Sequence, residues 1–190
     1  MCHDPIQYGA VLVDPPWTFK TYSEKGITPK GAGGQYSTMS TEEIWDIPLR
    51  TYMAPDSYAV VWATFPMINQ AMRAIEKWGL DYVTGGAWAK QSKTGEKWAF
   101  GTGYVLRSAA EPFLIARKGH PRTRSHSVRN LIAAPVREHS RKPDDMYDLV
   151  EQIAEGPYLE LFARQITGRP GWTHRGNELD KFAPDGVSHG

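Results

Sequence analysis

The chain has 190 residues, 41% hydrophobic and 12% aromatic, which is typical of one globular domain (residues 1–190) with a single core and excludes a disordered chain. Its 22 basic and 21 acidic residues leave a net charge of +1, so overall charge does not indicate a nucleic-acid-binding protein and only local clustering could. The single cysteine excludes an internal disulfide framework. The lack of an apolar leader or an 18-residue apolar run predicts a protein with no membrane partner, cytoplasmic or, in a eukaryotic host, nuclear.

The first predicted element is a buried strand at residues 10–13, which ends at Asp14 and two prolines. Its aliphatic run is typical of a parallel strand covered on both faces. Pro15 and Pro16 cannot donate to a sheet ladder, and the first of them disfavours helical geometry at Asp14. The chain therefore leaves the strand as a stiff turn. We expect this turn to display a carboxylate, backbone carbonyls and the Trp17 indole at the edge where open α/β sheets bind ligands.

This turn suits an exocyclic amino group such as adenine N6. The Asp14 carboxylate and the Pro15 carbonyl can accept hydrogen bonds from its two N–H groups. This directs the nitrogen lone pair toward an electrophile. Trp17 can stack on the base, an interaction worth about 1–3 kcal/mol. An acidic turn beside a core tryptophan is the alternative interpretation.

Residues 18–37 contain four glycines and three lysines without apolar periodicity, which predicts a long mobile loop. Because this loop follows the turn directly, we expect it to close over a bound base, with Lys20 and Tyr36 contacting the substrate. A surface insertion without function is the alternative.

Strands and helices alternate in the rest of the chain. Ser40 and Glu43 form a capping-box pattern that predicts a short helix to about Ile47. Helices are also expected to start at Pro66, ending at Gly79, and at Pro143. Further strands are predicted at residues 58–63, 82–88, 111–116 and 158–163. This alternation predicts an α/β fold with a mostly parallel sheet, a core of about residues 10–182 and a second mobile, glycine-rich loop at 91–110.

Residues 117–142 are basic, with eight arginines or lysines and one acidic residue. We interpret this segment as a stripe that contacts nucleic-acid phosphates through Arg122, Arg124 and Arg129, since each neutralised phosphate releases counterions. A solvated basic loop is the alternative. The three histidines in this segment lack metal-ligand spacing, and no metal is expected.

The sequence Asp14-Pro15-Pro16-Trp17 and the later segment 36–40 resemble the signature of the MT-A70-like family of S-adenosylmethionine-dependent N6-adenine methyltransferases, in particular compact bacterial or phage members. The resemblance runs from about residue 10 to 179. It implies a Rossmann-like class I methyltransferase fold in permuted order, with the catalytic motif first and the cofactor strand last. It also implies direct in-line transfer from S-adenosylmethionine to adenine N6 in DNA, within a bacterial or phage-infected cell. The catalytic residues that it implies are Asp14, Pro15, Pro16 and Trp17.

The resemblance also implies a cofactor site late in the chain. Lys142 matches the lysine that holds the methionine carboxylate, and a solvated lysine at a helix start is the alternative. The other cofactor-binding residues that it implies are Asp14, Glu160, Phe162, Arg164, Asn177 and Glu178.

The sequence is compatible with several functions. The residues do not separate DNA from RNA as the substrate. A non-catalytic scaffold subunit of a methyltransferase complex is an alternative, and methylation of a protein glutamine is another. A homodimer or a partner subunit is also left open, because sequence specificity must come from the loops, the basic stripe or a partner.

Overall fold

The computed structural model describes residues 6–17, 39–103, 105–138 and 140–182, so the predicted loop at 18–37, with Lys20 and Tyr36, lies outside the described residues. The strands are β1 (Tyr8–Val13), β2 (Met53–Trp62), β3 (Asp81–Gln91), β4 (Ala110–Lys118), β5 (Leu131–Pro135), β6 (Tyr158–Leu161) and β7 (Trp172–Arg175). The helices are α1 (Thr41–Trp45), α2 (Leu49–Tyr52), the 3-10 turn η3 (Phe65–Met67), α3 (Ile68–Lys77) and α4 (Asp145–Ile153).

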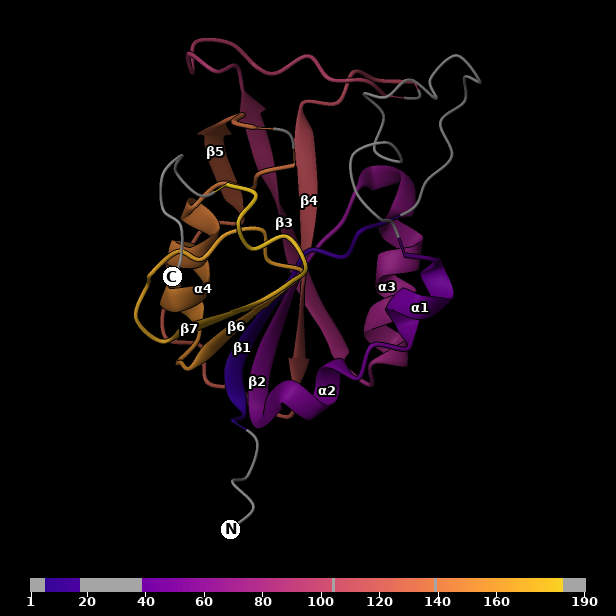
Figure 1. Cartoon of the computed structure of the whole chain (residues 1–190), viewed down its shortest axis with the longest axis vertical. Coiled ribbons are helices and arrows are strands. Elements are labelled where there is room, and N and C mark those ends of the chain that lie inside the picture. The colour runs from indigo at the N-terminus through magenta and orange to yellow at the C-terminus, as the bar shows by residue number, and fades with distance from the viewer. Residues whose placement is uncertain (1–5, 18–38, 104, 139, 183–190) are drawn as a thin grey trace.

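The strands form a twisted seven-stranded sheet in the order β5-β3-β4-β2-β1-β6-β7, with helices on both faces (Figure 1). Among the described strands, β4 runs antiparallel to its neighbours β2 and β3, and the other pairs are parallel. The prediction of a mostly parallel α/β sheet is therefore confirmed. None of the helices in the described ranges is long and apolar enough to span a membrane.

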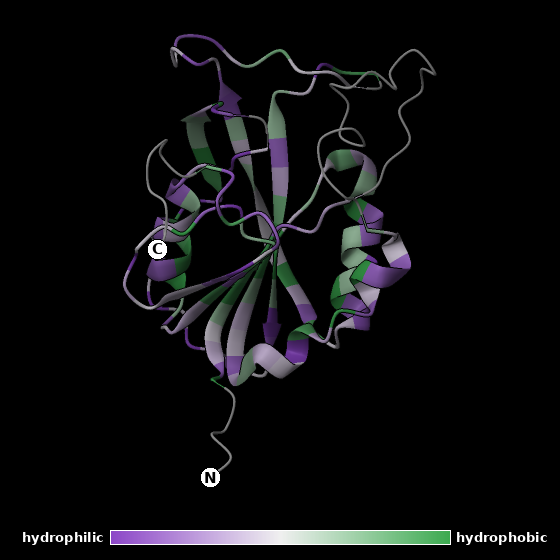
Figure 2. Ribbon diagram, in the orientation of Figure 1, coloured by the Kyte–Doolittle hydropathy of each residue, from purple (hydrophilic) through white to green (hydrophobic). Residues whose placement is uncertain are grey.

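β1 lies inside the sheet and is buried on both faces. Val11 and Val13 belong to the core on the side of α1 and α3, whereas Ala10 and Leu12 belong to the core on the side of α4. Apolar residues alternate with polar ones along the helices, as the hydropathy colours of Figure 2 show. Burial on both faces fixes the end of β1 in the middle of the carboxyl edge, and Asp14 follows there.

The predicted helix boundaries rest on caps that the structure contains. The Ser40 hydroxyl accepts a hydrogen bond from the Glu43 amide at 3.2 Å, and the Glu43 carboxylate accepts one from the Ser40 amide at 2.7 Å. Gly79 ends α3 with a φ of +68°, a conformation that favours glycine. The capping box and the glycine stop are therefore confirmed.

Two strands were missed in the sequence. β5 lies inside the basic segment and β7 inside a tail that reads as polar and glycine-punctuated. Both are edge strands, and residues of β5 are alternately exposed and buried. A short edge strand needs no continuous apolar run, so its sequence resembles that of a loop.

Candidate active site

The turn after β1 lies at the carboxyl edge of the sheet. The Asp14 amide donates to the Leu161 carbonyl at the end of β6, with an N–O distance of 3.4 Å. The Trp17 amide donates to the Pro15 carbonyl at 2.8 Å, which closes the turn. Asp14 is therefore held between the ends of two parallel strands.

Trp17 faces the core and not the ligand-binding edge. Its side chain is 5% exposed and packs in the core on the side of α1 and α3. The indole N–H donates to the Trp62 carbonyl at the end of β2, with an N–O distance of 3.0 Å. The expected display of this ring at the sheet edge is thus corrected: the indole anchors the turn to β2, and base stacking would require it to leave this position.

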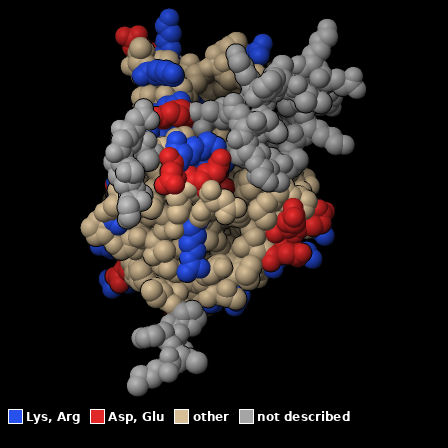
Figure 3. Space-filling view, in the orientation of Figure 1, with Lys and Arg blue, Asp and Glu red and all other residues tan. Residues whose placement is uncertain are grey.

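Four side chains of alternating charge run from the turn to β3. The Lys142 ammonium lies 3.0 Å from a carboxylate oxygen of Asp14 and 3.0 Å from one of Glu111. The other oxygen of Glu111 lies 2.6 Å from the Lys90 ammonium. Acidic and basic side chains also lie together near the centre of the face in Figure 3. Asp14 and Lys142 were predicted, and the fold adds Glu111 and Lys90.

Lys142 and Glu111, the two inner members of this chain of charges, are partly buried and stabilise each other. Burial opposes the charge of Lys142, but the carboxylates of Asp14 and Glu111 outweigh it and raise the pKa of Lys142. Burial likewise opposes the charge of Glu111, but the Lys142 and Lys90 ammonium groups together hold the pKa of Glu111 below its usual value. The structure therefore keeps both groups ionised at neutral pH.

A second polar cluster surrounds Glu160 in β6. The Tyr147 hydroxyl donates to its carboxylate at 2.9 Å. Burial raises the pKa of Glu160 to about 7, and the charge of Asp14 adds to the rise while the Tyr147 hydrogen bond opposes it. His174 Nε2 lies 3.6 Å from the same carboxylate, but burial lowers the pKa of His174, so its imidazole is neutral at neutral pH.

The segment after β7 lies against the loop after β6. The Ala163 amide donates to the Arg175 carbonyl at 3.0 Å. A Cβ on Gly176 would lie 2.1 Å from the Ala163 carbonyl oxygen, so only glycine fits there. This approach brings Glu178 within 3.5 Å of the Arg164 guanidinium.

A hollow at this edge collects most of the residues that the family resemblance assigned to the cofactor. Its lining includes Asp14, Lys142, Glu160, Phe162 and Arg164. Phe162 turns the chain out of β6 with a φ of +62°. Glu178 reaches this lining through its ion pair with Arg164, whereas Asn177 is exposed outside it.

Comparison with known proteins decides the family. The MT-A70 family model matches residues 8–178. The chain belongs to the MT-A70 family.

The curated relatives are longer than this MT-A70 chain. It is 31% identical over 180 residues to a probable N(6)-adenosine-methyltransferase MT-A70-like protein of Oryza sativa, covering 92% of this chain and 23% of the relative. It is 27% identical over 179 residues to the N(6)-adenosine-methyltransferase catalytic subunit METTL3 of Homo sapiens, covering 92% and 28%. It is 30% identical over 183 residues to the N6-methyladenosine RNA methyltransferase MTA1 of Cryphonectria parasitica, covering 92% and 52%. The matched region therefore spans from 23% to 52% of the length of these relatives.

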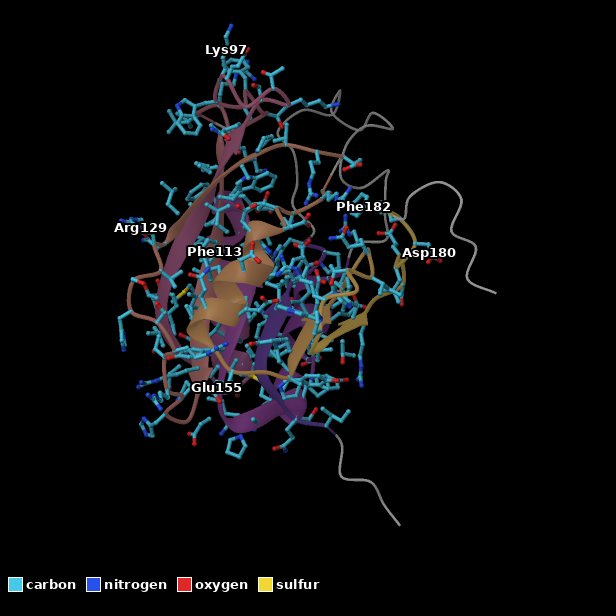
Figure 4. All side chains as sticks on the ribbon, turned by 90° about the vertical axis from the view of Figure 1, so that its left-hand side faces the viewer. Lys97, Phe113, Arg129, Glu155, Asp180 and Phe182 are labelled. Atoms are coloured by element: carbon cyan, nitrogen blue, oxygen red, sulfur yellow. The ribbon has the colours of Figure 1, made fainter. Side chains whose placement is uncertain are left out.

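The basic segment of this MT-A70 protein does not form one stripe beside Asp14. The Arg124 guanidinium donates to the Glu151 carbonyl, and the Arg124 backbone amide donates to the Ile153 carbonyl. Both acceptors lie near the C-terminal end of α4, away from Lys142. Arg122 lies between two residues that contact the Tyr58 hydroxyl, at the same end of the sheet. Arg129 points outward from the far edge in Figure 4. The three arginines predicted to contact phosphates thus lie away from Asp14, Arg122 and Arg124 at one end of the sheet and Arg129 at its edge.

Proposed function

We propose that this protein transfers a methyl group from S-adenosylmethionine to N6 of adenosine in RNA. The observation that carries the proposal is the Asp14 carboxylate and the adjacent Pro15 carbonyl at the carboxyl edge of β1, beside Lys142 and the hollow. Family membership supports the reaction class. The relatives are named as N6-adenosine methyltransferases, and one name specifies RNA, so they favour RNA over the DNA substrate expected from the sequence.

The side chains that line the hollow fit the methyl donor. S-adenosylmethionine carries a carboxylate, an ammonium group, a sulfonium cation and an adenine ring. The lining offers cations from Lys142 and Arg164, carboxylates from Asp14 and Glu160, and an aromatic ring from Phe162. When bound, this group supplies an electrophilic methyl. An ammonium has three N–H donors, so Lys142 can serve an incoming carboxylate while it contacts Asp14 and Glu111.

The turn orients the target nitrogen. The Asp14 carboxylate accepts a hydrogen bond from one N6 hydrogen. The Pro15 carbonyl accepts one from the other with its second lone pair, because the first is bonded to the Trp17 amide. This leaves the N6 lone pair directed toward the electrophile. Lys142 fixes one Asp14 oxygen at 3.0 Å, and Trp17 fixes the turn through its bond to Trp62. Catalysis then rests on positioning and electrostatics. The nitrogen becomes acidic once methylated, so its proton can leave to water or a carboxylate after transfer.

The proposal is tested with methyl-labelled S-adenosylmethionine and separate pools of RNA, single-stranded DNA and duplex DNA. We expect label in N6-methyladenosine from RNA, loss of the label in Asp14→Ala, and full retention in the matched control Asp81→Ala, whose carboxylate is largely exposed at the other end of the sheet. Label in DNA alone would overturn the substrate. No label in any pool, with cofactor binding intact, would overturn the catalytic role and favour a scaffold subunit.

A further inference from the structure

The connection between β3 and β4 is an extended loop that crosses the top of the molecule in Figure 1. We call its described residues, 92–103 and 105–109, the β3–β4 loop. Backbone hydrogen bonds order it: the Ser92 amide donates to the Lys97 carbonyl at 2.7 Å, and the Ala99 amide to that of Lys90 at 2.8 Å. The Gly101 amide donates to the Ser108 carbonyl at 2.9 Å. The loop is thus a hairpin-like extension of the sheet.

Two aromatic rings stand out from this extension. Trp98 is 64% exposed and Phe100 is 78% exposed. They alternate with Ala99 and Gly101, whose amides donate to the Lys90 and Ser108 carbonyls. Alternate side chains of an extended segment point to the same face, so we expect the two rings to share one face. Same-face neighbours on a strand lie about 7 Å apart, roughly twice the 3.4 Å rise of stacked bases. The spacing of the two backbone positions therefore matches the separation that two rings need to hold one planar base.

The charge around the rings is basic. The Arg107 guanidinium lies 5.0 Å from the centre of the Phe100 ring. Lys93 and Lys97 are exposed on the same loop, against one acidic residue, Glu96, and Figure 4 shows Lys97 projecting from the tip of the molecule. Aromatic rings among cations are the combination that binds single-stranded nucleic acids, with stacking for the bases and charge for the phosphates.

The base of the loop leads to the proposed active site. Lys90, near the end of β3, and Glu111, near the start of β4, flank the loop and form an ion pair with each other. Glu111 in turn shares the ammonium of Lys142 with Asp14. The rings therefore stand on the two strands whose ends carry charges connected to the catalytic turn.

We propose that Trp98 and Phe100 form a stacking platform for single-stranded nucleic acid, which holds bases that flank the target adenine. The identity of that target rests on the proposed function, but the platform itself needs no adenine. Bases of any kind present a flat face, so the platform is expected to bind without sequence preference.

The test is fluorescence anisotropy of the full chain with fluorescein-labelled oligo(U) and oligo(dT) of twelve nucleotides. These probes contain no adenine, so their binding is independent of methyl transfer, and a failure of the proposed function leaves this test intact. We expect Trp98→Ala and Phe100→Ala each to weaken binding about ten- to a hundredfold. Trp98→Phe keeps a ring and should retain most of the affinity.

Leu106→Ala is the matched control. Leu106 is 81% exposed on the same loop but has no ring, so its removal should leave probe affinity unchanged. Circular dichroism verifies that the variants are folded. Wild-type protein that binds neither probe, or an equal loss from Leu106→Ala and Trp98→Ala, would overturn the platform. A change of sedimentation coefficient in the ring variants, with probe binding unchanged, would overturn it in favour of a protein interface.

Discussion

The Lys142 ammonium lies 3.0 Å from the Asp14 carboxylate, although the two residues are 128 positions apart in the sequence. Asp14 follows β1, whereas Lys142 precedes α4, so the pair forms only when the sheet and its covering helix are assembled. The contact fixes the carboxylate that is proposed to hold the adenine amino group. The same ion pair therefore joins two parts of the fold and holds a side chain of the proposed active site.

Lys142→Met tests both roles of this ion pair. The substitution leaves the carboxylates of Asp14 and Glu111 without their shared cation. Breaking a fully buried pair costs about 3–5 kcal/mol, and these side chains are partly buried, so about 2–4 kcal/mol is expected. We expect a loss of that size in the free energy of unfolding, measured by urea denaturation, and a loss of methyl transfer. Lys77→Met, at an exposed lysine of α3, is the control and should change neither. A variant with wild-type stability and turnover would contradict the role of the pair.

Lys90→Met removes the outer cation of the same chain of charges. The lysines hold the pKa of Glu111 below 4.5, so their stabilisation is present above that pH and is lost as pH falls through the lowered pKa. We expect the variant to be less stable by about 1.5–3 kcal/mol at pH 7. The difference should shrink below about pH 4, in urea titrations of both proteins. A difference independent of pH would show that packing, and not the charge, is lost.

The sequence could predict the elements whose signal is local. The apolar run of β1, its Asp-Pro-Pro turn and the Ser40 capping box each lie within a few neighbouring residues. Glu111 could not be identified, because nothing local distinguishes a carboxylate that will meet Lys142 across the fold. The same holds for Trp17: its position after two prolines suggested a displayed ring, but the core beside β2 offers more burial and a carbonyl for its N–H.

The spread of the basic segment has a similar cause. Residues 117–142 are contiguous in sequence, but they run from the end of β4, past the C-terminal end of α4, to the edge strand β5. Basic residues that are neighbours in the sequence therefore lie on different parts of the fold. The aromatic and basic residues of the β3–β4 loop were visible in the sequence, but their exposure was not.

Trp17→Phe separates an anchoring role from a stacking role. The variant keeps an aromatic ring but loses the N–H that donates to the Trp62 carbonyl. We expect the unfolding free energy to fall by about 1–3 kcal/mol, since a buried hydrogen bond is broken. Thermal denaturation measures this, with the exposed Trp98→Phe as the control. Unchanged stability together with weaker substrate binding would show that the ring leaves the core to stack on the base.

Glu160→Gln tests the effect of burying a carboxylate. Its pKa is raised from 4.5 to about 7, so the unfolded chain releases this proton at lower pH than the folded one. The free energy of unfolding therefore falls as pH rises from about 4.5 to about 7. Glutamine mimics the protonated form and removes the fall. We expect equal stability at pH 4.5 and a gain of about 3 kcal/mol at pH 8. The exposed Glu155→Gln should show no such pH dependence, and parallel profiles for wild type and Glu160→Gln would contradict the raised pKa.

Gly176→Ala tests whether the segment after β7 must lie against the loop after β6. The added Cβ would lie 2.1 Å from the Ala163 carbonyl oxygen, so the two backbones must separate and carry Glu178 away from Arg164. Overpacking of this kind costs about 1–3 kcal/mol of stability, and we expect weaker S-adenosylmethionine binding by isothermal titration calorimetry. Gly168→Ala is the control, because a Cβ there meets nothing within 4 Å although its φ of +68° adds backbone strain. If both variants bound the cofactor equally well, the close approach at Gly176 would have no part in the cofactor site. If only Gly176→Ala bound it weakly, the backbone approach and the Arg164–Glu178 ion pair that it permits would contribute to that site.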